Sequence, residues 1–408
     1  MAKNGRISAS ELIKKREEKN CRILLTGGTG FLGAHLAVHF LENGCRLVLP
    51  VRPGKDLSPQ QRMDRLWNWF GLAPALRQNA RVIEARIDRP GFGLDSTTQS
   101  ELFETIDEII HCASDTSFSE RRREAVEAVN IGGLRNVLDL AVRARCGFFH
   151  LVSTAFVSGR ASGHCPEEFV SPSGFTNVYE ETKCRAEWLA RDACRQAGLP
   201  LSVFRPSIVY GHSETGRSLL FNALYYPVRT AVFLRNLFEA DIRERGGRRA
   251  AEMGVRMEND GWMHMPIRMD IEDGGGINLI PIDFFVRSFA AIREDFLDGG
   301  VFHLVNPRLK KTEQVIDYAR RLFRIRGIEA RSGAKSDLQP KNALEVLFDS
   351  YIEAYRPYMS DSRTFATRRA GSLLEKRGIR CPDFDYQIFA RCMTYAVECG
   401  WGSRLFKG

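Results

Sequence analysis

The sequence lacks the long apolar run that a membrane-spanning helix needs. No stretch of its 408 residues approaches the roughly 20 consecutive apolar side chains of such a helix. Residues 1–20 are polar and charged, without the apolar centre of a secretory signal peptide. We therefore expect a cytoplasmic protein with a charged N-terminal leader at 1–20 and no transmembrane segment. Peripheral contact of the C-terminal helices with a bilayer stays open, because nothing in their composition demands or forbids it.

Clustered metal ligands are also missing. The ten cysteines are scattered along the chain without a CxxC pair or a Cys/His cluster, which argues against structural zinc. Several lie in apolar stretches, as Cys112 does after Ile109 and Ile110, and read as small buried hydrophobic residues in a reducing compartment. No metal site is predicted.

The net charge of +9 comes partly from arginines gathered between residues 229 and 249. No nucleic-acid recognition motif or aromatic platform accompanies them, so nucleic acid is not a predicted partner. Two interpretations remain open. The arginines form either a basic rim that attracts an anionic substrate carrier or a solvated helix face.

The chain does contain a glycine run, and its position between two other patterns is informative. Thr26-Gly27-Gly28-Thr29-Gly30-Phe31-Leu32-Gly33 follows an apolar stretch and opens an amphipathic one. The order strand, glycine turn, helix is that of a dinucleotide-binding fingerprint, although a glycine-rich turn without a ligand is the alternative. Glycines let the backbone approach a pyrophosphate, and the helix N-terminus offers free N–H groups to it. The predicted cofactor contacts are Thr26, Gly27, Gly30, Phe31, Leu32 and Gly33.

Strand and helix patterns alternate from residue 22 to about residue 210. The predicted strands are 22–26, 46–51, 81–87, 107–112, 147–153 and 200–206, and the predicted helices are 31–43, 59–71, 98–105, 121–145 and 177–197. This alternation predicts an α/β fold with a Rossmann-type, doubly wound parallel sheet. We expect a cofactor-binding domain at 21–215, to which 277–308 returns. Residues 216–276, with a loop at 272–276, and 309–408 are expected to form a smaller, mainly helical substrate-binding cap.

The end of the second predicted strand indicates which dinucleotide binds. NAD sites place an acidic residue there to accept a hydrogen bond from the ribose 2′-hydroxyl. This chain has Arg52 instead, with Lys55 close by. Cations at this position suit a 2′-phosphate, so NADP(H) is favoured over NAD, unless Arg52 is an ordinary surface residue at a strand end.

Tyr179 and Lys183 lie four residues apart and therefore share one face of the predicted helix. A free tyrosine has a pKa near 10. We expect the ammonium group, together with an oxidised nicotinamide, to lower the pKa of Tyr179 toward neutral pH. Lys183 could also hold the ribose hydroxyls of the cofactor. The pair is frequent by chance, but the glycine run upstream strengthens it.

Ser153 and Thr154 end a predicted strand at the edge where open α/β sheets bind ligands. A hydroxyl there can donate a hydrogen bond to a substrate carbonyl and to the oxyanion that forms on reduction. Successive side chains point in opposite directions, so we expect one of the two, Thr154, to face the substrate. The alternative is a cap for the following turn.

Together these segments resemble the extended short-chain dehydrogenase/reductase superfamily. Within it, the chain is similar to the thioester-reductase and fatty acyl-CoA reductase branch, the "male sterility" type of NAD-binding domain. The resemblance covers roughly residues 20–310, and the C-terminal hundred residues match only loosely. Further matching segments are 110–114, 129–133, 205–211, 278–283 and 302–307.

The resemblance implies roles for individual residues. Tyr179 would be the proton donor, Lys183 its partner and Thr154 the third catalytic hydroxyl, while Asn130 would stabilise the active-site backbone. Further implied cofactor contacts are Cys112, Ala113, Ser114, Ser153, Pro206, Ser207 and Ile208.

Two departures from the pattern of the branch stand out. A Gly-Asp pair that commonly touches the adenine is replaced by Ala85-Arg86-Ile87, and the nearest acid is Asp88. Ile87 and Asp88 are therefore the predicted contacts there, and Arg86 could instead stack on the adenine or reach the 2′-phosphate. His212 stands where an aspartate is frequent.

The resulting hypothesis is NADPH-dependent reduction of an acyl thioester, carried by coenzyme A or an acyl carrier protein, to an aldehyde or on to an alcohol. The enzyme is expected to be a monomer or homodimer. An aromatic run could line an acyl tunnel or form ordinary core: Phe221, Tyr225, Tyr226, Phe233 and Phe238. A ketone reductase, dehydrogenase or sugar-nucleotide epimerase of the same superfamily is the alternative. A non-enzymatic dinucleotide sensor is disfavoured because such proteins tend to lose the Tyr/Lys pair.

Overall fold

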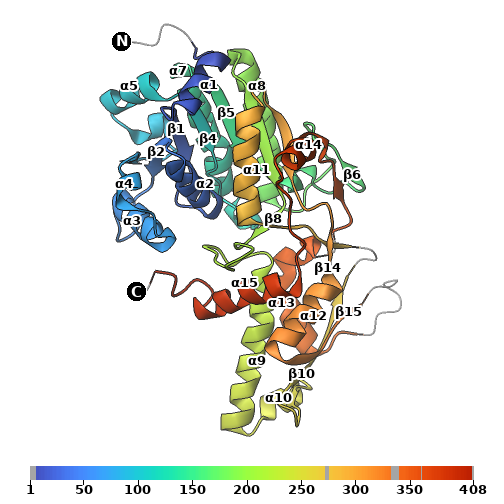
Figure 1. Ribbon diagram of the computed structural model, residues 1–408. Helices are drawn as coiled ribbons and strands as arrows, with labels where there is room; N and C mark the ends of the chain where they lie inside the picture. The colour runs from blue at the N-terminus through green and yellow to red at the C-terminus, as the bar shows by residue number, and fades with distance from the viewer. Residues whose placement is uncertain (1–5, 272–274, 332–339, 360, 407–408) are drawn as a thin grey trace.

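One parallel sheet organises the chain (Figure 1). The computed structural model describes residues 6–271, 275–331, 340–359 and 361–406, and within these ranges seven strands pair in the order β13-β7-β5-β4-β1-β2-β3. The strands are β1 (Arg22–Thr26), β2 (Arg46–Val51), β3 (Ala80–Glu84), β4 (Glu108–His111), β5 (Phe148–Val152), β7 (Leu201–Pro206) and β13 (Gly300–Leu304). Every neighbouring pair is parallel, and the order runs outward from β1 in both directions. The predicted Rossmann-type, doubly wound fold is confirmed.

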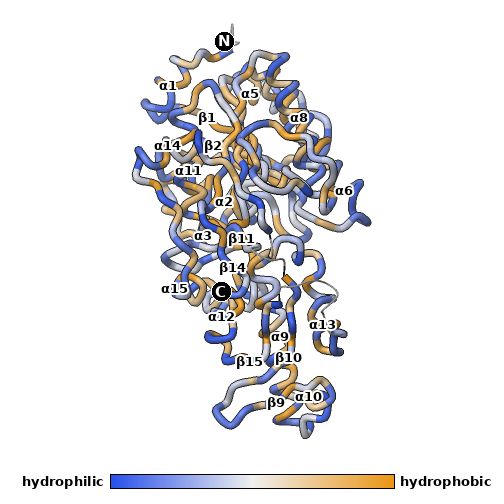
Figure 2. The backbone as a smooth tube through the Cα atoms, turned by 90° about the vertical axis from the view of Figure 1, so that its right-hand side faces the viewer, coloured by the Kyte–Doolittle hydropathy of each residue, from blue (hydrophilic) through white to orange (hydrophobic). Residues whose placement is uncertain are grey.

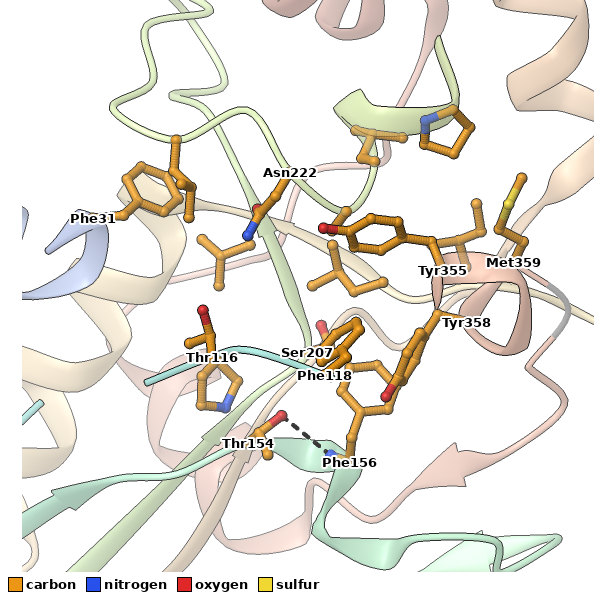
Figure 3. A pocket seen from close by; sticks show the side chains of 18 of the residues that line it. Phe31, Thr116, Phe118, Thr154, Phe156, Ser207, Asn222, Tyr355, Tyr358 and Met359 are labelled. Atoms are coloured by element: carbon orange, nitrogen blue, oxygen red, sulfur yellow. Dashed lines mark hydrogen bonds between the residues drawn. The ribbon is translucent and has the colours of Figure 1, made fainter. Parts of the chain in front are cut away.

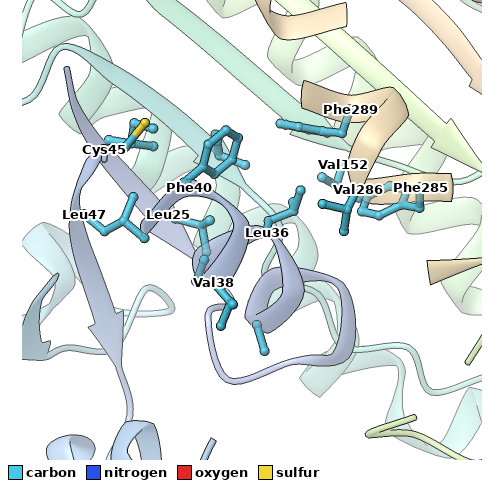
Figure 4. Packing of buried hydrophobic residues seen from close by; sticks show 14 of the residues in the cluster. Leu25, Leu36, Val38, Phe40, Cys45, Leu47, Val152, Phe285, Val286 and Phe289 are labelled. Carbon is cyan, nitrogen blue, oxygen red and sulfur yellow. The ribbon is translucent and has the colours of Figure 1, made fainter. Parts of the chain in front are cut away.

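Helices cover both faces of this sheet because its strands bury alternate side chains on each side. In β1, Ile23 and Leu25 join one core cluster and Leu24 joins the other. Leu36 and Phe40 of one covering helix pack near Phe285 and Phe289 of another (Figure 4). The first face carries α2 (Phe31–Glu42), α3 (Pro59–Phe70) and α11 (Ile282–Asp295), and the second carries α5 (Ser96–Thr105), α7 (Leu134–Arg143) and α8 (Val178–Ala197).

Two predicted elements differ in the structure. The third strand ends at Glu84, and residues 85–87 leave the sheet. The helix predicted at 121–145 is interrupted: η2 (Glu120–Arg122) and α6 (Arg123–Glu127) precede a π-helical turn, η3 (Ala128–Gly133), before α7. Such turns insert a residue into the helix and often occur at functional sites. Here the π turn contains Asn130.

The cap extends below the sheet in Figure 1 and forms a narrower lobe in Figure 2. Its helices are α9 (Tyr225–Arg245), α10 (Arg248–Glu252), α12 (Thr312–Phe323), α13 (Ala343–Ile352) and α15 (Tyr386–Glu398), whereas α14 (Arg368–Lys376) packs beside α11 against the central sheet (Figure 1). The prediction of a mainly helical cap missed a three-stranded sheet among the described residues, with β10 (Met263–Asp270) between β9 (Arg256–Met257) and β15 (Ile325–Arg331). Its signal in the sequence was the alternation of apolar and other residues over 263–270, and in the structure every second side chain of β10 is buried.

Short elements complete the chain. They are α4 (Pro74–Arg77), β6 (His164–Cys165), β8 (Ile208–Tyr210), β11 (Gly276–Ile277), β12 (Leu279–Pro281), β14 (Lys310–Lys311), η6 (Glu353–Tyr358) and β16 (Thr364–Phe365). Most of the predicted loop at 272–276 lies outside the described residues. None of the helices in the described ranges is both long and apolar enough to span a membrane.

The predicted leader contains a helix, α1 (Ala9–Glu17), that is tied to the sheet by buried charges. Arg16 Nη2 lies 2.7 Å from Glu108 Oε2, and Arg293 and His150 contact the same carboxylate. Burial opposes ionisation of Glu108, but Arg293 and Arg16 hold its pKa well below the usual range. Glu108 begins β4, so this cluster lies at the amino ends of the parallel strands. The glycine run lies at their carboxyl ends.

Replacing Glu108 by alanine would leave Arg16 and Arg293 buried without their carboxylate. We expect this Glu108→Ala variant to lose about 3–5 kcal/mol of unfolding free energy, measured by urea denaturation. Glu101→Ala is the matched control, because its ion pair with Arg81 is half exposed and is expected to contribute about 1 kcal/mol or less. Equal losses of unfolding free energy in the two variants would contradict the stabilising role assigned to the buried ion pairs of Glu108.

Candidate active site

A cavity of about 430 Å³ opens at the carboxyl ends of the central strands, between the sheet and the cap. The predicted catalytic residues Thr154, Tyr179 and Lys183 all line it. So do most of the predicted cofactor contacts: Gly27, Gly30, Phe31, Leu32, Gly33, Cys112, Ser114, Ser153, Pro206, Ser207 and Ile208. The structure therefore brings together residues that are spread over 180 positions of the sequence.

The glycine loop packs directly on the end of β4. Gly27 has φ +74°, and a Cβ there would lie 2.6 Å from the Ala113 nitrogen. A Cβ on Gly33 would lie 2.2 Å from the carbonyl oxygen of Gly27. No side chain of the described residues caps α2 at Gly30. Its first N–H groups therefore stay available to an anionic ligand.

Thr26 and Ala113 brace this loop instead of lining the cavity. The Thr26 hydroxyl accepts a hydrogen bond from the Ala113 N–H at 3.3 Å and lies 2.9 Å from His111 Nδ1. Burial lowers the pKa of His111 to about 3, so the imidazole is neutral. The brace consequently adds no charge beside the loop.

Two elements, the turn η4 and the helix α8, position the catalytic candidates. Thr154 begins the turn η4 (Ala155–Ser158), and its Oγ1 accepts a hydrogen bond from the Phe156 N–H at 3.3 Å (Figure 3). The residue is thus both a turn cap and part of the cavity wall. Tyr179 lies in the first turn of α8, which Asn177 caps. One turn later, Lys183 Nζ donates to the Val152 carbonyl at 2.7 Å.

Burial, not the neighbouring ammonium, dominates the titration of Tyr179. It raises the pKa of the phenol, and a hydrogen bond with Thr154 acts in the opposite direction. The expected lowering of this pKa is therefore wrong for the structure described. Burial also lowers the pKa of Lys183 to about 8. At neutral pH Tyr179 is an uncharged phenol, the form that can donate a proton.

Two buried hydroxyls face the cavity without a partner. Ser153 Oγ and Ser207 Oγ have no hydrogen-bond partner among the described residues. Buried hydroxyls are normally paired, so these two fit the polar end of a ligand. Together with the uncapped N-terminus of α2, they suit a nicotinamide dinucleotide. The described residues contain no group of three or more His, Cys, Asp or Glu side chains that could hold a metal ion.

A cationic corner lies beside the glycine loop. Arg52 and Lys55 are exposed just after β2 and do not line the cavity. Sequence reasoning missed Arg62, on α3, which donates to the Arg52 carbonyl at 2.6 Å and to Thr29 Oγ1 at 3.3 Å. Partial burial and the charge of Arg52 lower the pKa of Arg62. The sequence signal for Arg62 was its position one turn into the helix that follows β2, close to Arg52 in the sequence.

The predicted adenine contacts lie outside the cavity lining. Asp88 forms an ion pair with Arg86, with 3.0 Å between Nη2 and Oδ2. The Ile87 carbonyl accepts a hydrogen bond from Asn136 Nδ2 at 2.7 Å. The cofactor roles of Ile87 and Asp88 stay predictions, and Arg86 is engaged by Asp88.

Asn130 joins two walls of the site. Its Nδ2 donates to the Asp115 carbonyl and to Thr182 Oγ1, both at 3.0 Å. Its Oδ1 accepts from the Asp115 N–H at 2.8 Å and from the Ser114 hydroxyl at 3.0 Å. The π turn thus ties the segment after β4 to α8 between Tyr179 and Lys183.

The individual residues that line the cap side of the cavity were not predicted from the sequence. The lining positions of α9 are Pro227, Val228 and Ala231, which continue the helical spacing from Leu224, the residue before the helix. Of the two interpretations of Phe221, Tyr225, Tyr226, Phe233 and Phe238, the acyl tunnel is not supported, because none of these five lines the cavity. The unforeseen lining residues include Phe118, Phe156, Asn222, Met269, Val315, Ile316, Ala319, Ile328, Phe348, Tyr355, Tyr358 and Met359.

The arginines of α9 and α10 are partly paired within their own helices. Arg235 lies 2.7 Å from Glu239, and Arg248 lies 3.1 Å from Glu252, both at i,i+4 spacing. The solvated helix face is the better interpretation for Arg248, whose side chain is 88% exposed, whereas the Arg235 side chain is only 18% exposed.

Known proteins share both this fold and parts of this sequence. The model of an NAD-binding family described as "Male sterility protein" matches residues 25–288. The isonitrile lipopeptide synthase of Streptomyces coeruleorubidus is 30% identical over 231 residues, covering 54% of this chain and 15% of that protein. Fatty acyl-CoA reductase wat of Drosophila melanogaster is 27% identical over 228 residues, covering 47% and 43%. The chain thus spans less than half the length of these relatives.

Among solved structures, the terminal R domain of the myxalamid PKS-NRPS biosynthetic pathway superposes with a TM-score of 0.72 at 23% identity. The match covers 93% of this chain and 91% of that one, so the cap is shared as well as the sheet. The chain belongs to the male sterility family of NAD-binding domains.

Proposed function

We propose that this protein is an NADPH-dependent reductase of acyl thioesters, acting on acyl groups carried by coenzyme A or an acyl carrier protein. The observation that carries the proposal is the polarity of the cavity. Thr154, Tyr179 and Lys183 meet in a cavity whose cap side is almost wholly apolar. Among the described residues that line it, Lys183 alone is charged. An uncharged acyl group fits this cavity, and its carbonyl meets hydroxyl donors.

The chain's own residues would hold the cofactor at three places. The uncapped N-terminus of α2 would bind the pyrophosphate. Ser153 and Ser207 would bind the nicotinamide end, since their hydroxyls have no partner among the described residues. Arg52 and Arg62 would bind the 2′-phosphate, which favours NADP(H). When bound, NADPH supplies the hydrogen and the two electrons that reduce the thioester carbonyl.

The catalytic residues act on the charge that develops on the substrate oxygen. The Thr154 hydroxyl and the neutral Tyr179 phenol donate hydrogen bonds to the carbonyl and stabilise the oxyanion. Tyr179 then delivers its proton, and the charged Lys183 favours the phenolate that remains. The hemithioacetal formed in this way releases a thiol and an aldehyde. A second reduction of the aldehyde would give an alcohol.

The relatives support the substrate class, since one is named a fatty acyl-CoA reductase and another is the R domain of a PKS-NRPS pathway. Both candidate carriers are anionic and suit the basic chain. The cytoplasmic location and the monomeric or homodimeric state stay predictions, as do the proposed domain boundaries at residues 215 and 308.

Incubation with NADPH and a panel of acyl-CoAs and acyl carrier proteins tests the function. We expect mass spectrometry to detect the aldehyde or alcohol of at least one acyl group. Tyr179→Phe should lower kcat by about 10²- to 10⁴-fold, because it removes the proton donor. Tyr318→Phe, at a position of α12 that does not line the cavity, is the matched control and should keep kcat. Turnover of ketones or UDP-sugars without any thioester reduction would overturn the proposal.

The pH profile follows from the lowered pKa of Lys183, about 8. Raising the pH through this value removes the positive charge that favours the phenolate. We therefore expect kcat/KM to fall as the pH rises from 7 to 9, measured as initial NADPH oxidation. A profile that stays flat across this range would contradict the role assigned to Lys183.

Cofactor preference tests the cationic corner. Arg62→Ala should raise the KM for NADPH about tenfold, the size of a lost hydrogen bond to a charged group, and leave that for NADH unchanged. Arg65→Ala, an exposed arginine on the same helix, is the matched control. Equal changes toward NADPH and NADH would show that Arg62 does not read the 2′-phosphate.

A further inference from the structure

The C-terminal segment η6 reaches the catalytic helix through one tyrosine. The Tyr358 hydroxyl donates to Glu180 Oε1 at 2.5 Å and accepts from Asn177 Nδ2 at 2.6 Å. Glu180 follows Tyr179 directly and is fully buried. Its Oε2 accepts from the Thr176 N–H at 2.8 Å. A contact across 178 positions of the sequence therefore ends one residue from the proton donor.

The ring of Tyr358 forms part of an aromatic wall inside the cavity. Its centroid lies 5.5 Å from that of Phe118 and 5.0 Å from that of Phe156. Phe118 in turn lies 6.0 Å from Tyr179. Figure 3 shows Phe118, Phe156 and Tyr358 grouped beside Thr154. An acyl group whose carbonyl meets Thr154 must pass this wall to reach the apolar cap.

The hydrogen bond from the Tyr358 hydroxyl stabilises the buried carboxylate of Glu180. A buried carboxylate is costly unless donors satisfy its oxygens, and Tyr358 supplies one such donor to Glu180. Aromatic pairs are stable in both offset-stacked and edge-to-face geometries, so the contacts of Tyr358 with Phe118 and Phe156 do not by themselves require a single ring position. The hydrogen bond selects one position.

We propose that Tyr358 is a positioning residue for the acyl thioester, an inference that rests on the proposed function. Its hydroxyl holds the aromatic wall against the first turn of α8. The wall in turn directs the acyl group so that its carbonyl lies between Thr154 and Tyr179. The acyl group touches this wall before and during the reaction. Loosening the wall consequently weakens substrate binding more than it slows the chemical step.

Tyr358→Phe in the full chain tests this inference, with NADPH and the acyl-CoA that the wild type reduces fastest. We expect KM for the acyl-CoA to rise about tenfold, as for a lost hydrogen bond to a charged group. The kcat should stay within about twofold, because the donors to the oxyanion remain. The dissociation constant of NADPH, measured by its fluorescence, should not change. Tyr351→Phe makes the same change on the exposed face of α13 and is the matched control.

Two further variants keep the test decisive. Asn177→Ser retains a helix cap but removes the amide N–H that donates to Tyr358, so it should raise KM in the same direction. It also stands in if Tyr358→Phe fails to fold. In a Glu180→Gln background, Tyr358→Phe should change KM by no more than about threefold, because the charged acceptor is gone.

A KM within about twofold of the wild-type value in Tyr358→Phe would overturn the inference. So would a loss of kcat at unchanged KM, which marks a structural effect on the chemistry. If the wild type reduces no acyl thioester, the proposed function itself is wrong, and this appears before any variant is made. The two failures are therefore distinguishable.

Discussion

The site depends on the contact between the glycine loop and the end of β4. A Cβ on Gly27 or Gly33 would lie 2.6 Å or 2.2 Å from a backbone atom, so no other residue fits without moving the chain. This contact places the uncapped N-terminus of α2 at the carboxyl ends of the strands. The proposed cofactor position follows from it, because those N–H groups are the proposed site for the pyrophosphate. The catalytic side chains then need only to meet the other end of the same cavity.

The catalytic helix is held from two sides. Asn130 ties α8 to the segment after β4 through Thr182. Tyr358 ties the first turn of α8 to the cap through Glu180. The attached residues, Glu180 and Thr182, lie between Tyr179 and Lys183 in the sequence of α8. Their burial shifts both pKa values toward the neutral forms, which suits a phenol that donates a proton and limits the pH range in which the lysine is charged.

Stability and chemistry are separated across the sheet. The buried cluster around Glu108 joins α1, β4 and α11 at the amino ends of the strands. The cavity opens at their carboxyl ends. A parallel sheet separates the two regions because all its strands run in the same direction, and the ligand-binding loops follow the carboxyl ends of the strands. The charged N-terminal leader, which suggested no chemistry as a sequence, belongs to the stabilising edge.

The order of strands, the glycine turn and the pair Tyr179–Lys183 were readable from the sequence. Each depends on local spacing: apolar runs, a glycine cluster, and an i,i+4 relation. The break at the π turn, the early end of β3 and the sheet formed by β10 and β15 were not, because they depend on pairing and packing between distant segments. Arg62 shows the same limit at the cofactor site, since only folding brings α3 to Thr29.

What the sequence alone determined is the order of strands and helices, the glycine turn and the spacing of Tyr179 and Lys183, because strand, turn and helix periodicities are local properties of the chain. What only the tertiary structure decided is the surroundings of these two residues. The aromatic residues of α9 turned out to face away from the cavity, while Tyr358 reached it from the C-terminal segment. Burial reversed the expected shift of the Tyr179 pKa. Both depend on which surfaces the folded chain removes from water, and no local pattern specifies that.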